Sequence, residues 1–277
     1  SAPALAASTD ALLQQSTAAK SAVSVLDEEN DMMAEPEYQM NLKYGSITVY
    51  IGDDGKQYAK QGDYEAQQRG NLSITTNGGQ THNTITIKGG TTGAKVTLSN
   101  VNIDAPGAAV SVSGNVELVI AGTNTLQSGP KHAGVEKADD NGTLTISGTG
   151  TGTLEAYGGQ GGAGIGSGSQ KGCSNIVIES GTITAKGGVL GAGIGGGHGA
   201  AGQNITIRDG NVTAKPGGEA AGIGGGYASA GDVTIEGGTT VSAAGGVGGG
   251  GDGFAGGAGS GLPAHRNHVQ HLRLHSR

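Results

Sequence analysis

The segment NIVIESGTITAKGGVLGAGIGGG at residues 175–197 recurs as NITIRDGNVTAKPGGEAAGIGGG at residues 204–226, 29 positions later. The shorter block AGIGSG at Ala163 belongs to the same series, which continues as AGIGGG at Ala192 and Ala221. Each repeat contains two short segments with apolar residues at alternate positions, joined by a turn with glycine, which is the pattern of two half-buried strands. A fixed period of this length indicates one supersecondary unit that stacks on copies of itself.

Alignment of the repeats places aliphatic residues over aliphatic residues. Such columns are what parallel strands on successive coils require, because equivalent side chains then lie about 4.8 Å apart. The repeats therefore predict an all-β, single-stranded parallel β-helix with about 29 residues per coil in the C-terminal half. The predicted inward columns are Ile165/Ile194/Ile223, Ile176/Ile205/Val233, Ile178/Ile207/Ile235, Ile183/Val212/Val241 and Ala185/Ala214/Ala243.

Polar residues form columns of their own in the same alignment. Glu179, Arg208 and Glu236 are expected to stack on the outside as acid, base and acid. Asn175, Asn204 and Asp232 precede the strands, and we interpret them as structural residues that bond turn backbone and each other. The glycines of the AGIGGG blocks are expected where the chain turns sharply with φ values closed to other residues.

Composition supports a thin core and excludes two classes of partner. The 277 residues include 58 Gly but only 3% aromatic residues, so large side chains cannot fill a thick interior. A net charge of −7 argues against nucleic acid, whose phosphates attract clustered Lys and Arg. No apolar run reaches the roughly 18 residues of a membrane span. The only cysteine, Cys173, is expected to be a small filler.

Three regions are expected along the chain. Residues 1–40 form an Ala/Ser-rich linker or cap, residues 41–250 form the β-helix, and residues 251–277 form an irregular tail, disordered or non-native. The Ala/Ser-rich start fits a position after a removed signal peptide, which predicts a secreted or cell-surface protein. The pattern indicates no oligomeric state.

The central sequence resembles a family of bacterial cell-surface β-helix proteins with carbohydrate-binding domains. The likeness covers about residues 45–250 and is carried by the strings VTLSNVNIDAPGAAVSVSG from Val96, VELVIAGTNTLQSG from Val116, HAGVEK from His132 and GTITAKGGVLGAGIGGG from Gly181. The resemblance implies a right-handed helix, a secreted or wall-attached location, and binding of polysaccharide, including acidic plant polymers or host and cell-wall glycans. It also implies bound calcium in some members. These strings define the scaffold and do not identify the ligand.

Few residues in the repeats are suited to hold a glycan. Tyr157 and Tyr227 are the aromatic candidates for carbohydrate binding, since sugar rings stack on exposed aromatic faces. Glu136, Asp139 and Asp140 are the candidate calcium ligands, because Ca²⁺ takes several carboxylate and carbonyl oxygens. Asp53 with Asp54 is a second acidic pair, and for both groups an ordinary turn is the alternative interpretation.

Two other functions compete with glycan binding. Parallel β-helices include pectin hydrolases and lyases, and Asn102–Asp104, Asp139 with Asp140, and His198 between two glycines superficially match polygalacturonase elements. Their spacings do not bring paired acids to one face, as glycosidic cleavage requires, so we expect no enzyme. A structural stalk or adhesin passenger without a small-ligand site would show the same columns and stays open.

Overall fold

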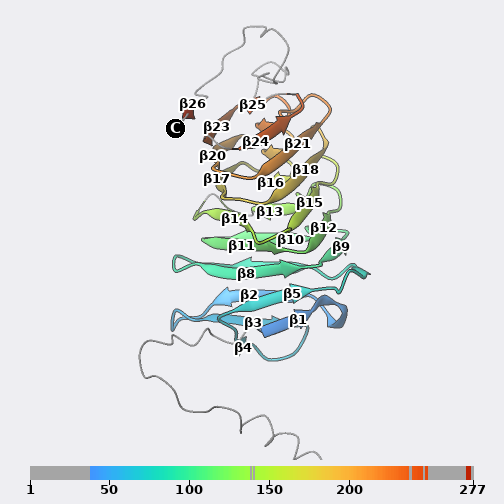
Figure 1. Ribbon diagram of the computed structural model, residues 1–277. Helices are drawn as coiled ribbons and strands as arrows, with labels where there is room; N and C mark the ends of the chain where they lie inside the picture. Colours follow the sequence, from blue (N-terminus) through green and yellow to red (C-terminus); the bar gives the residue numbers. More distant parts are fainter. Residues whose placement is uncertain are drawn as a thin grey trace, which may run out of the picture. The chain divides into compact units, whose positions relative to one another are not determined.

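Strands account for nearly all of the regular structure in the computed structural model, which describes residues 38–137, 139, 141–236, 239–245, 247–248 and 273–275. Successive coils lie one above another, and each complete coil after the first contributes one strand to each of three sheets (Figure 1). All strand pairs from β5 onward are parallel. The predicted parallel β-helix is therefore confirmed.

The first of the three sheets, sheet A, receives the first strand of every coil. Its strands are nine among the described residues, and neighbours in space are one coil apart in sequence. In spatial order they are β1 (Tyr38–Asn41), β5 (Leu72–Thr75), β8 (Ala94–Ser99), β11 (Val116–Ala121), β14 (Leu144–Gly148), β17 (Cys173–Ile178), β20 (Gly202–Ile207), β23 (Gly231–Glu236) and β26 (Arg273–His275).

From the second coil onward, sheet C receives the second strand of each complete coil and sheet B the third. Sheet C consists of β6 (Gln80–Thr81), β9 (Asn102–Asp104), β12 (Thr123–Gln127), β15 (Thr153–Tyr157), β18 (Thr182–Val189), β21 (Asn211–Gly217) and β24 (Thr240–Ala243). Sheet B consists of β4 (Gln67–Gln68), β3 (Gln57–Gln61), β2 (Ile47–Ile51), β7 (Ile85–Lys88), β10 (Val110–Ser113), β13 (Val135–Lys137), β16 (Ile165–Gly166), β19 (Ile194–Gly195), β22 (Ile223–Gly224) and β25 (Val247–Gly248).

The N-terminal end of sheet B departs from the parallel pattern. Strands β2 and β3 form an antiparallel hairpin around the turn after Gly52, and β4 pairs antiparallel with β3. In the first coil a short 3-10 helix, η1 (Leu42–Tyr44), stands where later coils have a sheet C strand. Strand β3 therefore runs antiparallel to both of its neighbours, β2 and β4, while β2 is parallel to β7 in the rest of the sheet.

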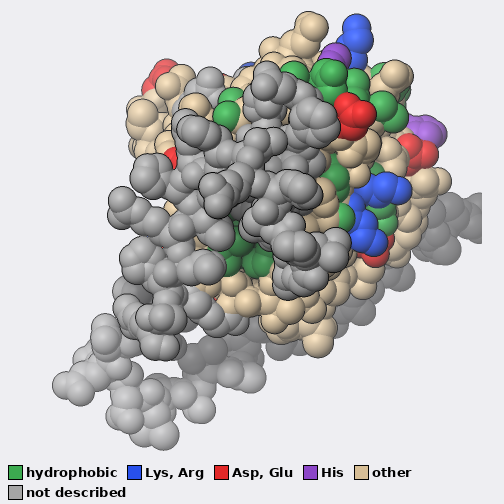
Figure 2. Space-filling view, turned by 90° about the horizontal axis from the view of Figure 1, so that it is seen from above, with side chains coloured by type: hydrophobic (Ala, Val, Ile, Leu, Met, Phe, Trp, Pro, Cys, Tyr) green, Lys and Arg blue, Asp and Glu red, His purple; other side chains and the backbone are tan. Residues whose placement is uncertain are grey.

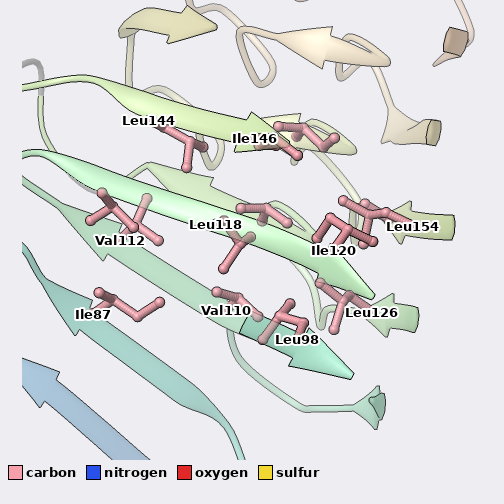
Figure 3. Close-up of a cluster of buried hydrophobic side chains, with 14 of the residues drawn as sticks. Ile87, Leu98, Val110, Val112, Leu118, Ile120, Leu126, Leu144, Ile146 and Leu154 are labelled. Carbon is pink, nitrogen blue, oxygen red and sulfur yellow. The ribbon is translucent and has the colours of Figure 1, made fainter. Parts of the chain in front are cut away.

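The core is a set of aliphatic columns that follow the stack. The five predicted columns pair in register, as in Ile165 with Ile194 and Ile194 with Ile223. Along strands β17, β18, β20 and β21 the buried column residues alternate with residues that are more accessible, such as Thr184, Thr206 and Thr213, because successive side chains of a strand point to opposite faces. Figure 3 shows the same arrangement in the earlier coils, where Leu98 pairs with Ile120 and Leu118 with Ile146. Each fully buried Val, Leu or Ile contributes about 1.5–3 kcal/mol.

Two polar columns were also predicted, and one is continuous. Arg208 bonds the carboxylate of Glu179 through its Nη1 and lies 3.5 Å from Glu236 through its Nε, which confirms the acid, base and acid series. Asn204 Nδ2 donates to Asn175 Oδ1 at 3.1 Å. The register between β20 and β23 then shifts, so Asp232 does not extend this amide pair in simple register.

Glycine is required at the coil corners for a second reason, which the sequence analysis did not identify. Gly195 has a φ of 129°, which is the expected left-handed requirement. Gly188 has no such φ, but a Cβ on it would lie 1.9 Å from the carbonyl oxygen of Gly159 on the preceding coil. A Cβ on Gly217 would likewise lie 1.8 Å from the carbonyl oxygen of Gly188. At these positions glycine is required because the coils stack backbone against backbone.

The predicted region boundaries stay predictions. Residues 1–37 of the predicted linker and most of the predicted tail at 251–277 lie outside the described residues. Strand β1 spans the predicted boundary at residue 40, and β26 within the tail pairs with β23 of sheet A.

Candidate functional site

Tyr157 lies on the outer face of sheet C, at the end of β15. The neighbouring Leu154 and Ala156 are buried, so alternation directs Tyr157 and Glu155 outward. The Tyr157 hydroxyl donates a hydrogen bond to Glu155 Oε2 at 3.0 Å. An aromatic ring and a carboxylate therefore share one exposed face.

Two polar residues flank Tyr157 along the stack. Gln127 of β12 pairs with Tyr157 on one side, and Lys186 of β18 pairs with it on the other. We call Gln127, Glu155, Tyr157 and Lys186 the sheet C strip. The strip offers an aromatic face, an acceptor, an amide and a cation on three adjacent coils, a combination that suits a polyhydroxyl ligand.

The Tyr157 phenol is a donor under ordinary conditions. Partial burial raises its pKa above the ordinary value of 10.0, and the hydrogen bond to Glu155 and the charge of that carboxylate raise it further. All three causes favour the neutral phenol, because burial and a nearby negative charge both disfavour a phenolate. The hydroxyl thus stays protonated at neutral pH and keeps Glu155 oriented.

Tyr227 lies in a different part of the surface, in the turn after β22. Its backbone N–H donates to the carbonyl of Leu190 at 3.0 Å. Its ring centroid lies 5.9 Å from that of His198, which occupies the equivalent turn one coil earlier. Tyr227 is two coils farther along the stack than Tyr157 and follows a sheet B strand, so the two predicted tyrosines belong to separate surfaces.

Glu136, a predicted calcium ligand, is buried and surrounded by donors. Its Oε2 accepts hydrogen bonds from His132 Nδ1 at 2.8 Å and from the Ala133 amide at 3.1 Å. Lys171 Nζ lies 3.8 Å from Oε1. This carboxylate is neutralised from within the protein, which is the arrangement expected for a buried charge.

Asp139, the second predicted ligand, contacts a different cation. The Lys137 ammonium is fully buried and donates to the Asp139 carbonyl at 2.6 Å and to the Asn141 carbonyl at 3.0 Å. It also lies 3.3 Å from Asp139 Oδ1, and Oδ2 accepts from the Gly114 amide at 3.2 Å. The described residues contain no group of three His, Cys, Asp or Glu side chains placed to hold a metal. Asp140 lies outside the described residues, so calcium at this cluster stays a prediction.

The alternative acidic pair and the pectinase-like elements also have defined positions. Asp54 accepts hydrogen bonds from the Lys56 amide at 3.1 Å and from the Tyr58 hydroxyl at 2.8 Å. Both hydrogen bonds lower the pKa of Asp54, and the bond from the Lys56 amide has the larger effect.

The three pectinase-like elements lie apart from one another. Asn102–Asp104 form β9 in sheet C, Asp139 lies between sheets B and A, and His198 lies in a turn after sheet B. These elements occupy separate parts of the coil.

Comparison with known proteins supports the repeat architecture. A family model described as a β-helix repeat matches residues 176–198 and 205–227, the two segments that carry the most regular columns. No curated protein and no solved structure matches the chain. In the part of the chain that the structure describes, no helix is long and apolar enough to cross a membrane. The repeat is compatible with a structural or a polysaccharide-related protein.

Sequence reasoning identified Tyr157 but missed its neighbours. Lys186 follows Tyr157 by 29 residues, which is the coil period, and Glu155 precedes it by two, which is the spacing of one strand face. Both spacings are readable in the sequence. Gln127 was harder to find because the earlier coils do not keep a constant length.

Proposed function

We propose that this protein binds polysaccharide, on the cell surface or after secretion, and that the sheet C strip holds the glycan. The observation that carries this proposal is the hydrogen bond from Tyr157 to Glu155 on an exposed face, with Gln127 and Lys186 in register on either side. The cell-surface or secreted location rests on the resemblance alone.

The chemistry of the strip suits a sugar chain. A pyranose ring stacks its apolar face on a tyrosine, while its hydroxyl groups bond carboxylate, amide and ammonium groups around the ring. Strands in a parallel sheet lie about 4.8 Å apart, so successive coils present positions at a regular interval along an extended polymer. Lys186 pairs in turn with Lys215, and both side chains are exposed, which favours a glycan that carries carboxylates.

Calcium can assist such binding by bridging acidic sugars to protein oxygens. We propose binding without cleavage, since the acids that resemble pectinase elements lie in separate parts of the coil. Asp139 and Asp140 stay the candidate calcium ligands, and because Asp139 lies between sheets B and A, an ion there would bind a part of the glycan away from the sheet C strip.

A structural stalk is the second candidate function. The observation in its favour is the column of close backbone contacts at Gly159, Gly188 and Gly217, which stiffens the stack without forming a ligand site. A stalk needs the columns and makes no use of the sheet C strip.

A glycan array of neutral and acidic polysaccharides separates these functions. The protein is applied once with calcium and once with chelator. Retention on one class of polysaccharide supports the proposed function, and its loss with chelator assigns a role to calcium. Silence on every glycan favours the stalk, and release of soluble products from pectin would reveal an enzyme.

A further inference from the structure

The outer face of sheet A contains a hollow with a volume of about 270 Å³ where β8, β11 and β14 begin. It lies on a different sheet from the sheet C strip. Its polar lining comes from Thr92, Lys95, Asn115, Glu117, Thr143 and Thr145.

Unequal turns between sheets B and A create this hollow. The coil of β11 enters sheet A through the two residues Gly114 and Asn115, which follow directly on β10. The coil before it uses the longer connection 89–93, and in the coil after it β13 ends at Lys137 and β14 begins only at Leu144. Asn115 of the short turn and Thr92 and Thr143 from the two neighbouring coils line the hollow together.

Asn115 holds the two sides of the hollow in place. Its Nδ2 donates to the Thr91 carbonyl at 2.8 Å, and its Oδ1 accepts from the Thr143 amide at 2.9 Å. These bonds tie the preceding and following coils to the short turn. The shape of the hollow is thus set before any ligand arrives, which reduces the entropy lost on binding.

The charges in the hollow are balanced. Lys95 and Glu117 are in register on β8 and β11, and Lys95 Nζ lies 2.9 Å from Glu117 Oε1. Thr145 continues the same row on β14. A ligand of either net charge gains little from a neutral ion pair. A neutral molecule with adjacent hydroxyl groups can donate to the carboxylate and accept from the ammonium together.

We propose that this hollow binds one neutral sugar unit through two adjacent hydroxyl groups, one on Glu117 and one on Lys95. The volume of about 270 Å³ lies just below the roughly 300–1,000 Å³ of sites for drug-sized molecules, so it suits a single monosaccharide unit. The inference rests on the proposed function for its class of ligand, but it assigns a second site that does not use Tyr157.

The test is an amide NMR titration of the whole protein with the methyl glycosides of glucose, galactose and mannose, and with glucuronate as a charged comparison. At least one neutral glycoside should shift the amide signals of Lys95, Asn115 and Thr145, and glucuronate should shift them less. Glu117→Gln and Lys95→Met should each weaken the neutral sugar by about tenfold or more, because each removes a charged hydrogen-bonding partner.

Glu179→Gln is the matched control. Glu179 is also an ion-paired glutamate, directly after β17 of sheet A, with a side chain 36% exposed against 40% for Glu117, but it does not line the hollow. Its variant should bind the glycoside like the parent and show that loss of an exposed ion pair is not enough. Equal melting temperatures of the variants show that the fold is intact.

The inference is overturned if no neutral glycoside shifts these amides, or if Glu117→Gln leaves the titration unchanged. To distinguish this failure from failure of the proposed function, polysaccharide retention is measured for the parent protein and for Tyr157→Ala. A silent hollow combined with glycan retention that depends on Tyr157 overturns the second site alone. Glycoside binding in the hollow without any polysaccharide retention supports the second site and removes the proposed role of the strip.

Discussion

The side-chain carboxylate of Glu136 accepts a hydrogen bond from the backbone amide of Ala133 at 3.1 Å. In the next three coils the equivalent alanine amides donate to backbone carbonyls of the glycine-rich turn, at Ser167, Gly196 and Gly225. Glu136 thus supplies by side chain the acceptor that later coils supply by backbone. Its position is explained without a metal ion, and it joins an irregular coil to the regular repeats.

Replacement of Glu136 by alanine should destabilise the fold by about 2–3 kcal/mol, because the Ala133 amide and His132 would lose their acceptor. Glu136→Gln keeps an acceptor oxygen and should cost less, about 1–2 kcal/mol. Denaturant unfolding followed by circular dichroism measures both values. Equal losses for the two variants would show that the charge, and not the acceptor, is what matters.

Gly188→Ala should be among the most damaging single-methyl changes in the chain. The new Cβ would lie 1.9 Å from the Gly159 carbonyl oxygen, and backbone cannot withdraw without opening two coils. We expect a loss of at least about 2 kcal/mol. Gly172→Ala is the control, since the nearest atom to its Cβ is 3.8 Å away, and it should change stability by less than about 1 kcal/mol. Similar melting temperatures for the two variants would contradict the stacking argument.

Tyr157→Ala should weaken polysaccharide retention by about 5- to 30-fold, which corresponds to about 1–2 kcal/mol of lost ring contact. Tyr157→Phe keeps the ring and should retain most of the binding, with a smaller loss from the freed Glu155. Tyr64→Ala removes another tyrosine, 77% exposed, and should leave retention unchanged. Affinity electrophoresis in gels that contain the bound polysaccharide gives all three values. A parent-like Tyr157→Ala would rule out the sheet C strip as the site.

The Tyr157 phenol should ionise above the ordinary pKa of about 10. Burial, then the hydrogen bond to Glu155 and its charge, favour the protonated form in the folded protein. Its contribution to stability is therefore present below the unfolded pKa and is lost as pH rises through the folded pKa. An ultraviolet titration of the parent minus Tyr157→Phe isolates this group. Glu155→Gln should lower the midpoint while the effect of burial remains, and a parent midpoint at or below 10 would disprove the assignment.

Prediction from the sequence was most successful where the coils repeat strictly. Leu154, Ile183, Val212 and Val241 are each 29 residues apart and pair in register, so counting was enough to place them in one column. The earlier coils differ in length: Val110 pairs with Val135, 25 residues later, because this coil has shorter turns than the 29-residue coils. Such a pairing depends on turn geometry, which composition and period do not specify.

The sequence by itself determined that strands stack in parallel with aliphatic columns inside, because side-chain alternation and a constant period allow one register only. The two-residue spacing of Glu155 and Tyr157, which places them on one strand face, was also readable in the sequence, although the sequence analysis did not use it. Tertiary structure alone decided that Glu136 accepts hydrogen bonds from the Ala133 amide and His132. It also decided that Gly188 has no room for a methyl group and that a hollow lies beside Lys95 and Glu117. Each of these depends on how closely neighbouring coils approach and on how far each turn extends, and both are set by contacts between segments distant in the chain.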